Sequence, residues 1–132
     1  GAFHMNTCIS YLRNLDILLM RETASGRAAL KAMLEFSGAR VTACRSTQEL
    51  FHSLESCRAS FDAILIDLPL TGQEAYTMLL RLWQVAPQIP LVIVGPMRDY
   101  EGYSFPFGLD ITARTFEPLS VSQLESCFCN FL

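Results

Sequence analysis

The fold of this chain is restricted most by a regular alternation of two patterns. Short apolar runs rich in β-favouring residues alternate with stretches of helical periodicity; the runs are Asp16–Met20, Val41–Cys44, Ala63–Ile66, Leu91–Val94 and, more weakly, Ile111–Phe116. This alternation is typical of βαβ units and predicts a parallel sheet with helices on both faces. Because such crossovers are right-handed, five strands favour the flavodoxin-like order 2-1-3-4-5. We therefore expect a single three-layer α/β domain.

Three segments between the strands carry a strong signal for a helix start. Ser46–Glu49, Thr71–Glu74 and Ser120–Gln123 each fit the capping box, in which a hydroxyl and a Glu or Gln satisfy the free amides at a helix N-terminus. Gly38 is placed to end the first helix in a left-handed conformation.

Helical periodicity also predicts which side chains face the sheet. The first helix, Ser25–Ser37, is expected to bury Ala29, Leu30, Met33 and Phe36. The third helix, Gln73–Val85, is expected to bury Ala75, Met78, Leu79 and Leu82. The last helix, Val121–Phe131, is expected to bury Val121, Leu124, Cys127, Phe128 and Phe131.

Composition excludes several classes of protein. A chain of 132 residues is long enough for one domain with a proper core. No apolar run approaches membrane-spanning length, although 51% of the residues are hydrophobic. The net charge is −3 with scattered basic residues, which argues against a basic nucleic-acid-binding face. The first five residues, Gly1–Met5, look like the remnant of an expression tag, so the domain is taken as residues 6–132.

The chain offers little for catalysis or structural metal binding. Its five cysteines include no C-x-x-C pair, so they are read as reduced thiols that mostly serve packing. His52 lies beside the apolar face of the second helix and is expected to be a surface or packing residue. No serine elbow or glycine-rich phosphate loop is present, so neither a nucleophilic triad nor a nucleotide site is predicted.

Asp67 directly follows the apolar run Ala63–Ile66. The carboxyl ends of parallel strands are where open α/β sheets place their functional groups, so Asp67 is the leading candidate for a functional residue. On its own, it could also be a solvated aspartate at a strand end.

The chain from Leu15 onward resembles a response-regulator receiver domain. Leu15–Glu22 is similar to the opening strand and acidic turn of that family, and Phe61–Asp67 resembles the strand that carries its phosphorylated aspartate. Phe116–Leu119 resembles the Lys-Pro turn that follows its last strand. The resemblance implies a flavodoxin-like fold and makes Asp67 the phospho-acceptor position.

Carried over position by position, the resemblance implies that most helper groups of this family are missing, with Glu22 kept as one possible metal ligand. The family holds magnesium with two acidic residues, where this chain has Arg21 and Glu22. Gly95 stands at the position of a hydroxyl that reads the phosphoryl group, and Glu117 replaces a lysine. The loop after Asp67 is also shorter than usual, which puts the backbone ligand of the metal in doubt. Arg21 is expected to pair with Asp67 or Glu22, and magnesium is expected to bind weakly or not at all.

Two surfaces are candidates for contact with partners. The apolar face of the third helix is widened by Tyr76, Leu80 and Trp83. These residues are either buried more deeply than one sheet requires or form a docking patch. Tyr100, Tyr103, Phe105 and Phe107 lie where receivers have their fourth helix, which glycines and a proline should shorten or remodel. This second segment is either an aromatic loop packed on the last helix or the preferred interface.

The favoured function is that of a pseudo-receiver: a non-enzymatic signalling module of a bacterial phosphorelay that acts through protein contacts. Expected partners are neighbouring domains of a histidine kinase or another signalling protein, or a second copy of the domain, with neither nucleic acid nor membrane contacted. The resemblance extends to degenerate domains inside hybrid sensor histidine kinases, which implies a location in the cytoplasm, including the cytoplasmic part of a membrane-bound kinase.

Two alternatives remain open. The first is an atypical response regulator that is still phosphorylated on Asp67. The second is a flavodoxin-like domain that binds a small molecule or acts as an enzyme, which an ordered ligand above the strand ends would favour.

Overall fold

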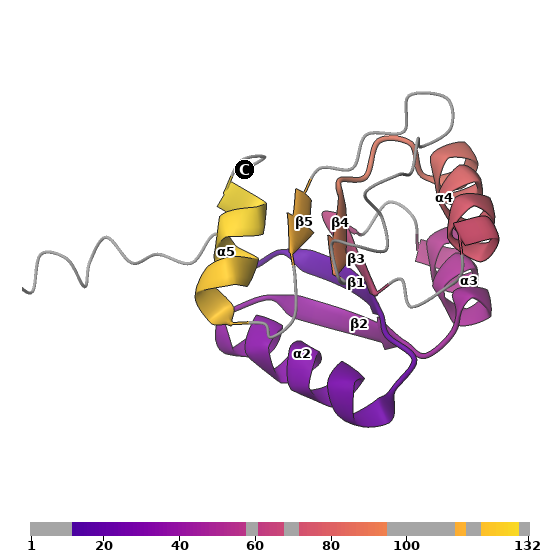
Figure 1. The fold of residues 1–132 in the computed structure, drawn as a ribbon. Coiled ribbons are helices and arrows are strands. Elements are labelled where there is room, and N and C mark those ends of the chain that lie inside the picture. The colour runs from indigo at the N-terminus through magenta and orange to yellow at the C-terminus, as the bar shows by residue number, and fades with distance from the viewer. Residues whose placement is uncertain (1–11, 58–60, 68–71, 95–112, 116–119, 130–132) are drawn as a thin grey trace, which may run out of the picture.

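The computed structural model describes residues 12–57, 61–67, 72–94, 113–115 and 120–129. Figure 1 shows strands and helices in strict alternation over most of this part. In chain order they are β1 (Asp16–Met20), α2 (Ala24–Phe36), β2 (Arg40–Cys44), α3 (Thr47–Cys57), β3 (Ala63–Asp67), α4 (Gly72–Val85), β4 (Leu91–Val94), β5 (Ala113–Thr115) and α5 (Val121–Cys129).

The strands form one parallel sheet in the order β2-β1-β3-β4-β5, so the predicted topology is confirmed. β1 lies between β2 and β3, with Met20 opposite both Cys44 and Ile66. β3 continues one residue further than predicted, and its last residue, Asp67, lies opposite Val94 of β4. The carboxyl ends of β1, β3 and β4 therefore meet at one edge.

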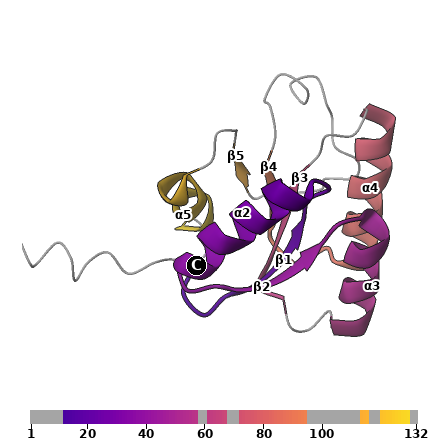
Figure 2. The ribbon, with the colours of Figure 1, turned by 90° about the horizontal axis from the view of Figure 1, so that it is seen from below.

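Helices cover both faces of the sheet and give three layers, as Figure 2 shows. Strand side chains alternate between the faces. Leu18, Ile64 and Ile93 point toward α3 and α4, where they join a core with Leu50 and Leu79. The alternate positions point toward α2 and α5 and pack in a second core; among them are Ile17, Leu19, Leu65 and Val92, together with Leu30, Leu34, Leu124 and Phe128 of the helices. Both cores are built of apolar side chains, which accounts for the high apolar content.

The helix ends follow the predicted capping in the described residues. At the start of α5 the Ser120 amide donates to Gln123 Oε1 (2.8 Å) and the Gln123 amide donates to Ser120 Oγ (3.2 Å), a complete capping box. At the start of α3, the Glu49 amide donates to Ser46 Oγ (3.2 Å). Gly38 follows the C-cap of α2 with φ = 97°, in the left-handed region. The third predicted box begins at Thr71, outside the described residues.

The predicted buried face of α2 is only partly right: Leu30 and the half-buried Met33 pack against the core as predicted. α2 buries Leu30 and Leu34, whereas Ala29 is exposed and Phe36 is 86% exposed. The buried positions continue to Ser37, which is 8% exposed. The sequence prediction placed Phe36, rather than Leu34, on the buried side. The helix nevertheless turns its Leu34 side to the sheet, because a fully buried leucine there joins the core that α5 completes.

The other predicted helix faces agree with the structure where it describes them. In α4 the four predicted core residues are all buried, and in α5 Leu124 and Phe128 are buried while Val121 is half-buried. The side chain of Cys127 and residue Phe131 lie outside the described residues. The buried Cys44 packs in the α3–α4 core, as predicted for a cysteine of this chain.

A bidentate ion pair ties together the amino ends of β1 and β2. Arg40 donates from Nε to Asp16 Oδ1 (2.8 Å) and from Nη2 to Asp16 Oδ2 (2.9 Å). Asp62, just before β3, accepts the Asp16 amide (2.8 Å). Three neighbouring strands are thus joined at this end by polar contacts, away from the edge that carries Asp67.

No helix in the described part of the chain has the length and apolar content needed to cross a bilayer.

Candidate functional site

The candidate site is built where β1 and β3 end side by side. Because Met20 lies opposite Ile66, the next residues of the two strands, Arg21 and Asp67, are brought together at the carboxyl edge of the sheet. The Arg21 amide donates to the Cys44 carbonyl (3.1 Å), so the backbone stays anchored to β2 at this point. The sequence prediction that Arg21 approaches Asp67 or Glu22 is confirmed for Asp67.

Arg21 and Asp67 form a direct ion pair with little exposure to solvent. Arg21 Nε donates to Asp67 Oδ2 at 3.0 Å, and the two side chains are 13% and 21% exposed. Burial raises the pKa of Asp67 above its ordinary value, and this effect outweighs the charge and hydrogen bond of Arg21, which lower it. The carboxylate is thus costly to bury, and the guanidinium offsets only part of that cost.

The turn between β1 and α2 is held by another arginine. Arg27 Nη1 donates to the backbone carbonyls of Arg21 (2.9 Å) and Glu22 (3.2 Å). Glu22 itself is exposed and borders a hollow of about 350 Å³ between α3 and α4. In the described residues, no group of three or more His, Cys, Asp or Glu side chains is arranged to hold a metal ion.

Two predicted site residues cannot be placed. Gly95 follows β4, and Glu117 precedes α5; both lie outside the described residues, so the positions expected for the hydroxyl and the lysine rest on the sequence.

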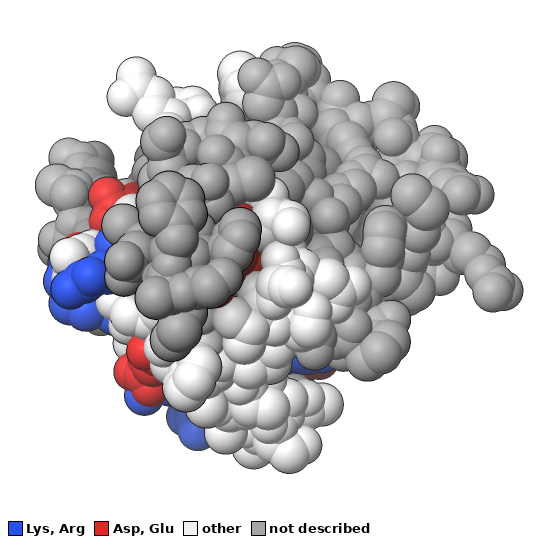
Figure 3. Space-filling view, turned by 90° about the vertical axis from the view of Figure 1, so that its left-hand side faces the viewer, with Lys and Arg blue, Asp and Glu red and all other residues white. Residues whose placement is uncertain are grey.

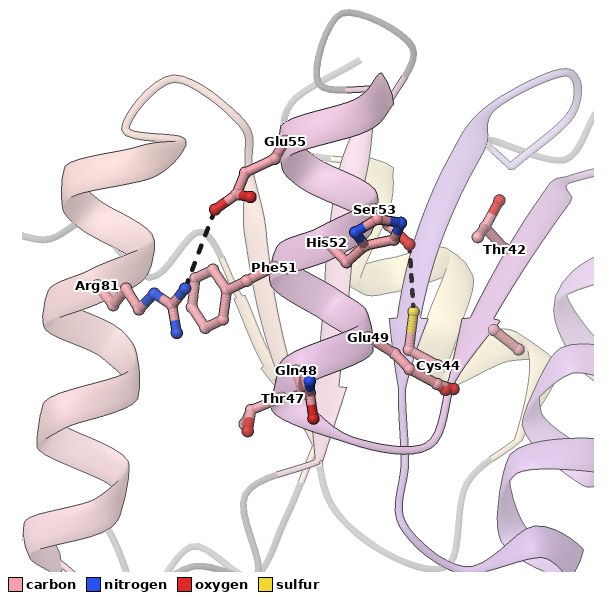
Figure 4. A pocket seen from close by; sticks show the side chains of 11 residues that line it. Thr42, Cys44, Thr47, Gln48, Glu49, Phe51, His52, Ser53, Glu55 and Arg81 are labelled. Atoms are coloured by element: carbon pink, nitrogen blue, oxygen red, sulfur yellow. Dashed lines mark hydrogen bonds and ion pairs between the residues drawn. The ribbon is translucent and has the colours of Figure 1, made fainter.

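The larger described hollow, about 700 Å³, lies elsewhere, along α3 beside the edge strand β2 (Figure 4). Arg81 of α4 reaches across to it, stacks on the Phe51 ring at 3.9 Å from the centroid and approaches Glu55 Oε1 at 4.0 Å. His52 is exposed on its lining, as expected for a surface residue.

The buried thiol in this lining is not activated as a nucleophile. Cys44 Sγ lies 3.7 Å from Ser53 Oγ, and burial raises the pKa of the Cys44 thiol. The raised pKa keeps this thiol protonated at neutral pH, and the hollow that it borders is not lined by Asp67.

The predicted contact surface on α4 is partly exposed. Tyr76 is 38% exposed, while Leu80 and Trp83 are half-buried. The aromatic segment Tyr100–Phe107 lies outside the described residues. Seen from the side that carries α5 (Figure 3), the described surface is mainly uncharged, with a few basic and acidic side chains of both signs.

Sequence reasoning missed two residues that shape the site: Gly26, which lies against the Arg21 side chain, and Arg27, which donates to the Arg21 carbonyl. A glycine inside a helical pattern is an anomaly that calls for a packing reason. Arg27 gave no comparable signal, because an arginine on the first turn of a helix looks like an ordinary surface residue.

No known family profile matches the sequence, and no curated protein matches it either. Its solved structural neighbours are response-regulator receiver domains. The chemotaxis response regulator CheY4 of Vibrio cholerae matches with a TM-score of 0.71 and 16% identity, over 90% of this chain and 99% of that chain.

Two further neighbours come from larger signalling proteins. The receiver domain of the sensor histidine kinase PA1611 from Pseudomonas aeruginosa, which has a magnesium ion in its active-site cleft, gives a TM-score of 0.71 at 20% identity, over 89% and 97% of the two chains. Full-length FixJ from B. japonicum gives 0.68 at 19% identity, over 87% of this chain and 58% of FixJ. At these identities the likeness establishes the fold: this chain has the receiver fold.

Proposed function

We propose that this chain is a pseudo-receiver, a signalling domain of a two-component or phosphorelay system that works without phosphorylation of Asp67. The observation that carries the proposal is the partly buried Arg21–Asp67 ion pair, with Nε and Oδ2 3.0 Å apart. In a receiver fold this carboxylate must accept a phosphoryl group. Here one of its oxygens already accepts a hydrogen bond from a fixed cation.

The residues present do not fit the magnesium ion that receivers use. Magnesium takes oxygen ligands in a near-ideal octahedron, and a guanidinium has no lone pair to offer it. Arg21 also places a permanent positive charge against one of the two remaining acidic groups, and the second, Glu22, is exposed. We infer that the guanidinium takes over the charge-balancing role and that magnesium binds no tighter than millimolar.

The sequence adds two departures that act on the phosphoryl group itself. Gly95 offers no hydroxyl at the position after β4, and Glu117 would repel a phosphoryl group where a lysine is expected. Each loss removes an interaction that both stabilises the phosphorylated state and reports it. Together they favour the pseudo-receiver over the atypical response regulator still phosphorylated on Asp67.

A direct test is the response of the folded domain to magnesium and beryllofluoride, which mimics a phosphorylated aspartate. We expect the amide NMR spectrum to show no saturable shift around Asp67 in the native chain. The Arg21→Asp variant should bind magnesium more tightly, because it restores a second acidic ligand. Saturation of the native chain below millimolar magnesium would instead support the phosphorylated alternative.

Without phosphorylation, the domain must signal through a surface whose contact free energy differs between states of the parent protein. The proposed partners are neighbouring domains of a histidine kinase or another signalling protein, or a second copy of this chain, in the cytoplasm. On the described surface, the partly exposed Tyr76 of α4 is the candidate anchor, since aromatic side chains bury large area at low entropic cost.

This surface can be tested with one substitution and a neighbouring control. Tyr76→Ala should leave the fold intact and weaken self-association or interdomain docking by about 1–3 kcal/mol, the usual range for an anchoring aromatic. Thr77→Ala, next to it and also exposed, should change neither. Unchanged docking by Tyr76→Ala in sedimentation experiments would remove α4 as the interface and leave the Tyr100–Phe107 segment as the candidate.

A further inference from the structure

Gly26 lies in the first turn of α2, where Arg21 passes on its way to Asp67. A Cβ added at Gly26 would lie 3.1 Å from Arg21 Nε and 3.5 Å from Arg21 Cδ. The closer of these atoms is the one that donates to Asp67, so it cannot move aside without changing the ion pair. Glycine is a poor helix former, and at this position it provides the space in which the guanidinium lies.

A Cβ at Gly26 would also approach Thr23 Oγ1 at 2.6 Å. Thr23 is the N-cap of α2 but makes no side-chain capping bond, so its hydroxyl can rotate away without the loss of a cap. Arg21 has no equivalent freedom, because Nε is held by Asp67. The contact with Arg21 is therefore the one that decides the effect of a side chain at this position.

Arg27 holds the backbone from which the Arg21 side chain extends. Its Nη1 atom bonds to the carbonyls of Arg21 and Glu22 at 2.9 and 3.2 Å, and it sets the direction in which the chain leaves β1. Since Arg27 belongs to α2 and Arg21 follows β1, these bonds lock the helix against the strand end. The backbone of Arg21 is thereby held at the point from which its side chain reaches Asp67.

We propose that Gly26 and Arg27 are positioning residues that hold the Arg21 guanidinium on Asp67 as a built-in counter-ion. The inference rests on the proposed function for its biological meaning, because it explains how the domain keeps its carboxylate engaged. The first turn of α2 then acts as a fixed cradle: Gly26 provides the space and Arg27 fixes the backbone.

The test follows the Arg21 Nε–H group itself, whose nitrogen resonance and hydrogen exchange are measurable by NMR in the intact chain. In the native chain we expect a slowly exchanging Nε–H. Gly26→Ala should speed its exchange by roughly tenfold or more, the equivalent of one hydrogen bond to a charged group. The matched control is Ser25→Ala, which also introduces alanine in the first turn, at an exposed position.

Arg27 provides a second, independent variant. Arg27→Met removes the donor to both carbonyls and should also speed exchange, whereas Arg27→Lys keeps a donor and should retain most of the protection. If Gly26→Ala does not fold, as judged by circular dichroism, this pair decides the question. Native exchange rates in folded Gly26→Ala, or equal rates in Arg27→Met and Arg27→Lys, would overturn the proposal.

These outcomes are separate from those of the proposed function. Phosphorylation of Asp67 in the native chain would contradict the pseudo-receiver without changing the predicted order of exchange rates. Conversely, unchanged rates in the variants would remove the positioning roles and leave an unphosphorylated Asp67 in place.

Discussion

Two aspartates at opposite ends of the sheet are shifted in opposite directions by their surroundings. The bidentate hydrogen bonds from Arg40 hold the pKa of Asp16 below its ordinary value of 3.8. Asp67 also has an arginine partner, yet burial raises its pKa above 3.8. The difference lies in solvent: Asp16 is well exposed and keeps its hydration, while Asp67 loses most of its own.

These shifts predict that the two aspartates contribute to stability with opposite dependence on pH. Since the pKa of Asp16 is lowered by folding, its contribution is present above pH 3.8 and is lost as the pH falls through the lower folded value. The contribution of Asp67 is fully present below pH 3.8 and is lost as the pH rises through its higher folded value. Asp16→Asn should therefore weaken the pH dependence of the free energy of unfolding below pH 3.8. Asp67→Asn should weaken that dependence above pH 3.8.

The measurement is urea unfolding of the native chain and both variants across this pH range, together with carboxyl-carbon NMR titrations of the two aspartates. Measured pKa values on the same side of 3.8 would contradict this account.

For single residues, the sequence predicts which side chains meet at the site better than it predicts the path that each side chain takes. The approach of Arg21 to Asp67 follows from parallel strands that end side by side, so it was predictable. The role of Gly26 was not, because the path of a long side chain over a helix depends on dihedral angles that no pattern encodes. Gly95 and Glu117 remain sequence predictions.

Among the elements, α2 is a correctly predicted helix whose buried face is rotated away from the prediction. The predicted face comprised Ala29, Leu30, Met33 and Phe36. The structure keeps Leu30 and partly buries Met33, but it buries Leu34 and Ser37 in place of Ala29 and Phe36. Ser37 Oγ has no hydrogen-bond partner within the described residues. Periodicity fixes the spacing of buried positions, while the neighbouring α5 and the sheet decide the phase.

The choice of face leads to a stability prediction. Leu34→Ala should destabilise the domain by about 2–5 kcal/mol, because it opens a cavity in the core. Phe36→Ala should change the free energy of unfolding by no more than about 0.5 kcal/mol, because Phe36 is 86% exposed. Denaturant unfolding of the two variants decides between the faces, and a large loss from Phe36→Ala would restore the face predicted from the sequence.

For the whole molecule, the alternation of strands and helices was sufficient to predict topology. Each strand is buried on both faces or lies at an edge, and right-handed crossovers leave few orders for five parallel strands. The same reasoning gives no access to surface hollows such as the one along α3, because these depend on how neighbouring helices pack. It also leaves the partner unspecified, since contact surfaces are read from exposure, which periodicity predicted incorrectly for Phe36.

The central claim concerns Asp67 as a phospho-acceptor, and one measurement addresses it most directly. The native chain, the Asp67→Asn variant and an active receiver domain as positive control are incubated with magnesium and acetyl phosphate, and intact masses are recorded. The pseudo-receiver account predicts that the native chain keeps its unmodified mass, as the Asp67→Asn variant does, while the positive control gains a phosphoryl group. Stoichiometric phosphorylation of the native chain that disappears in Asp67→Asn would contradict it.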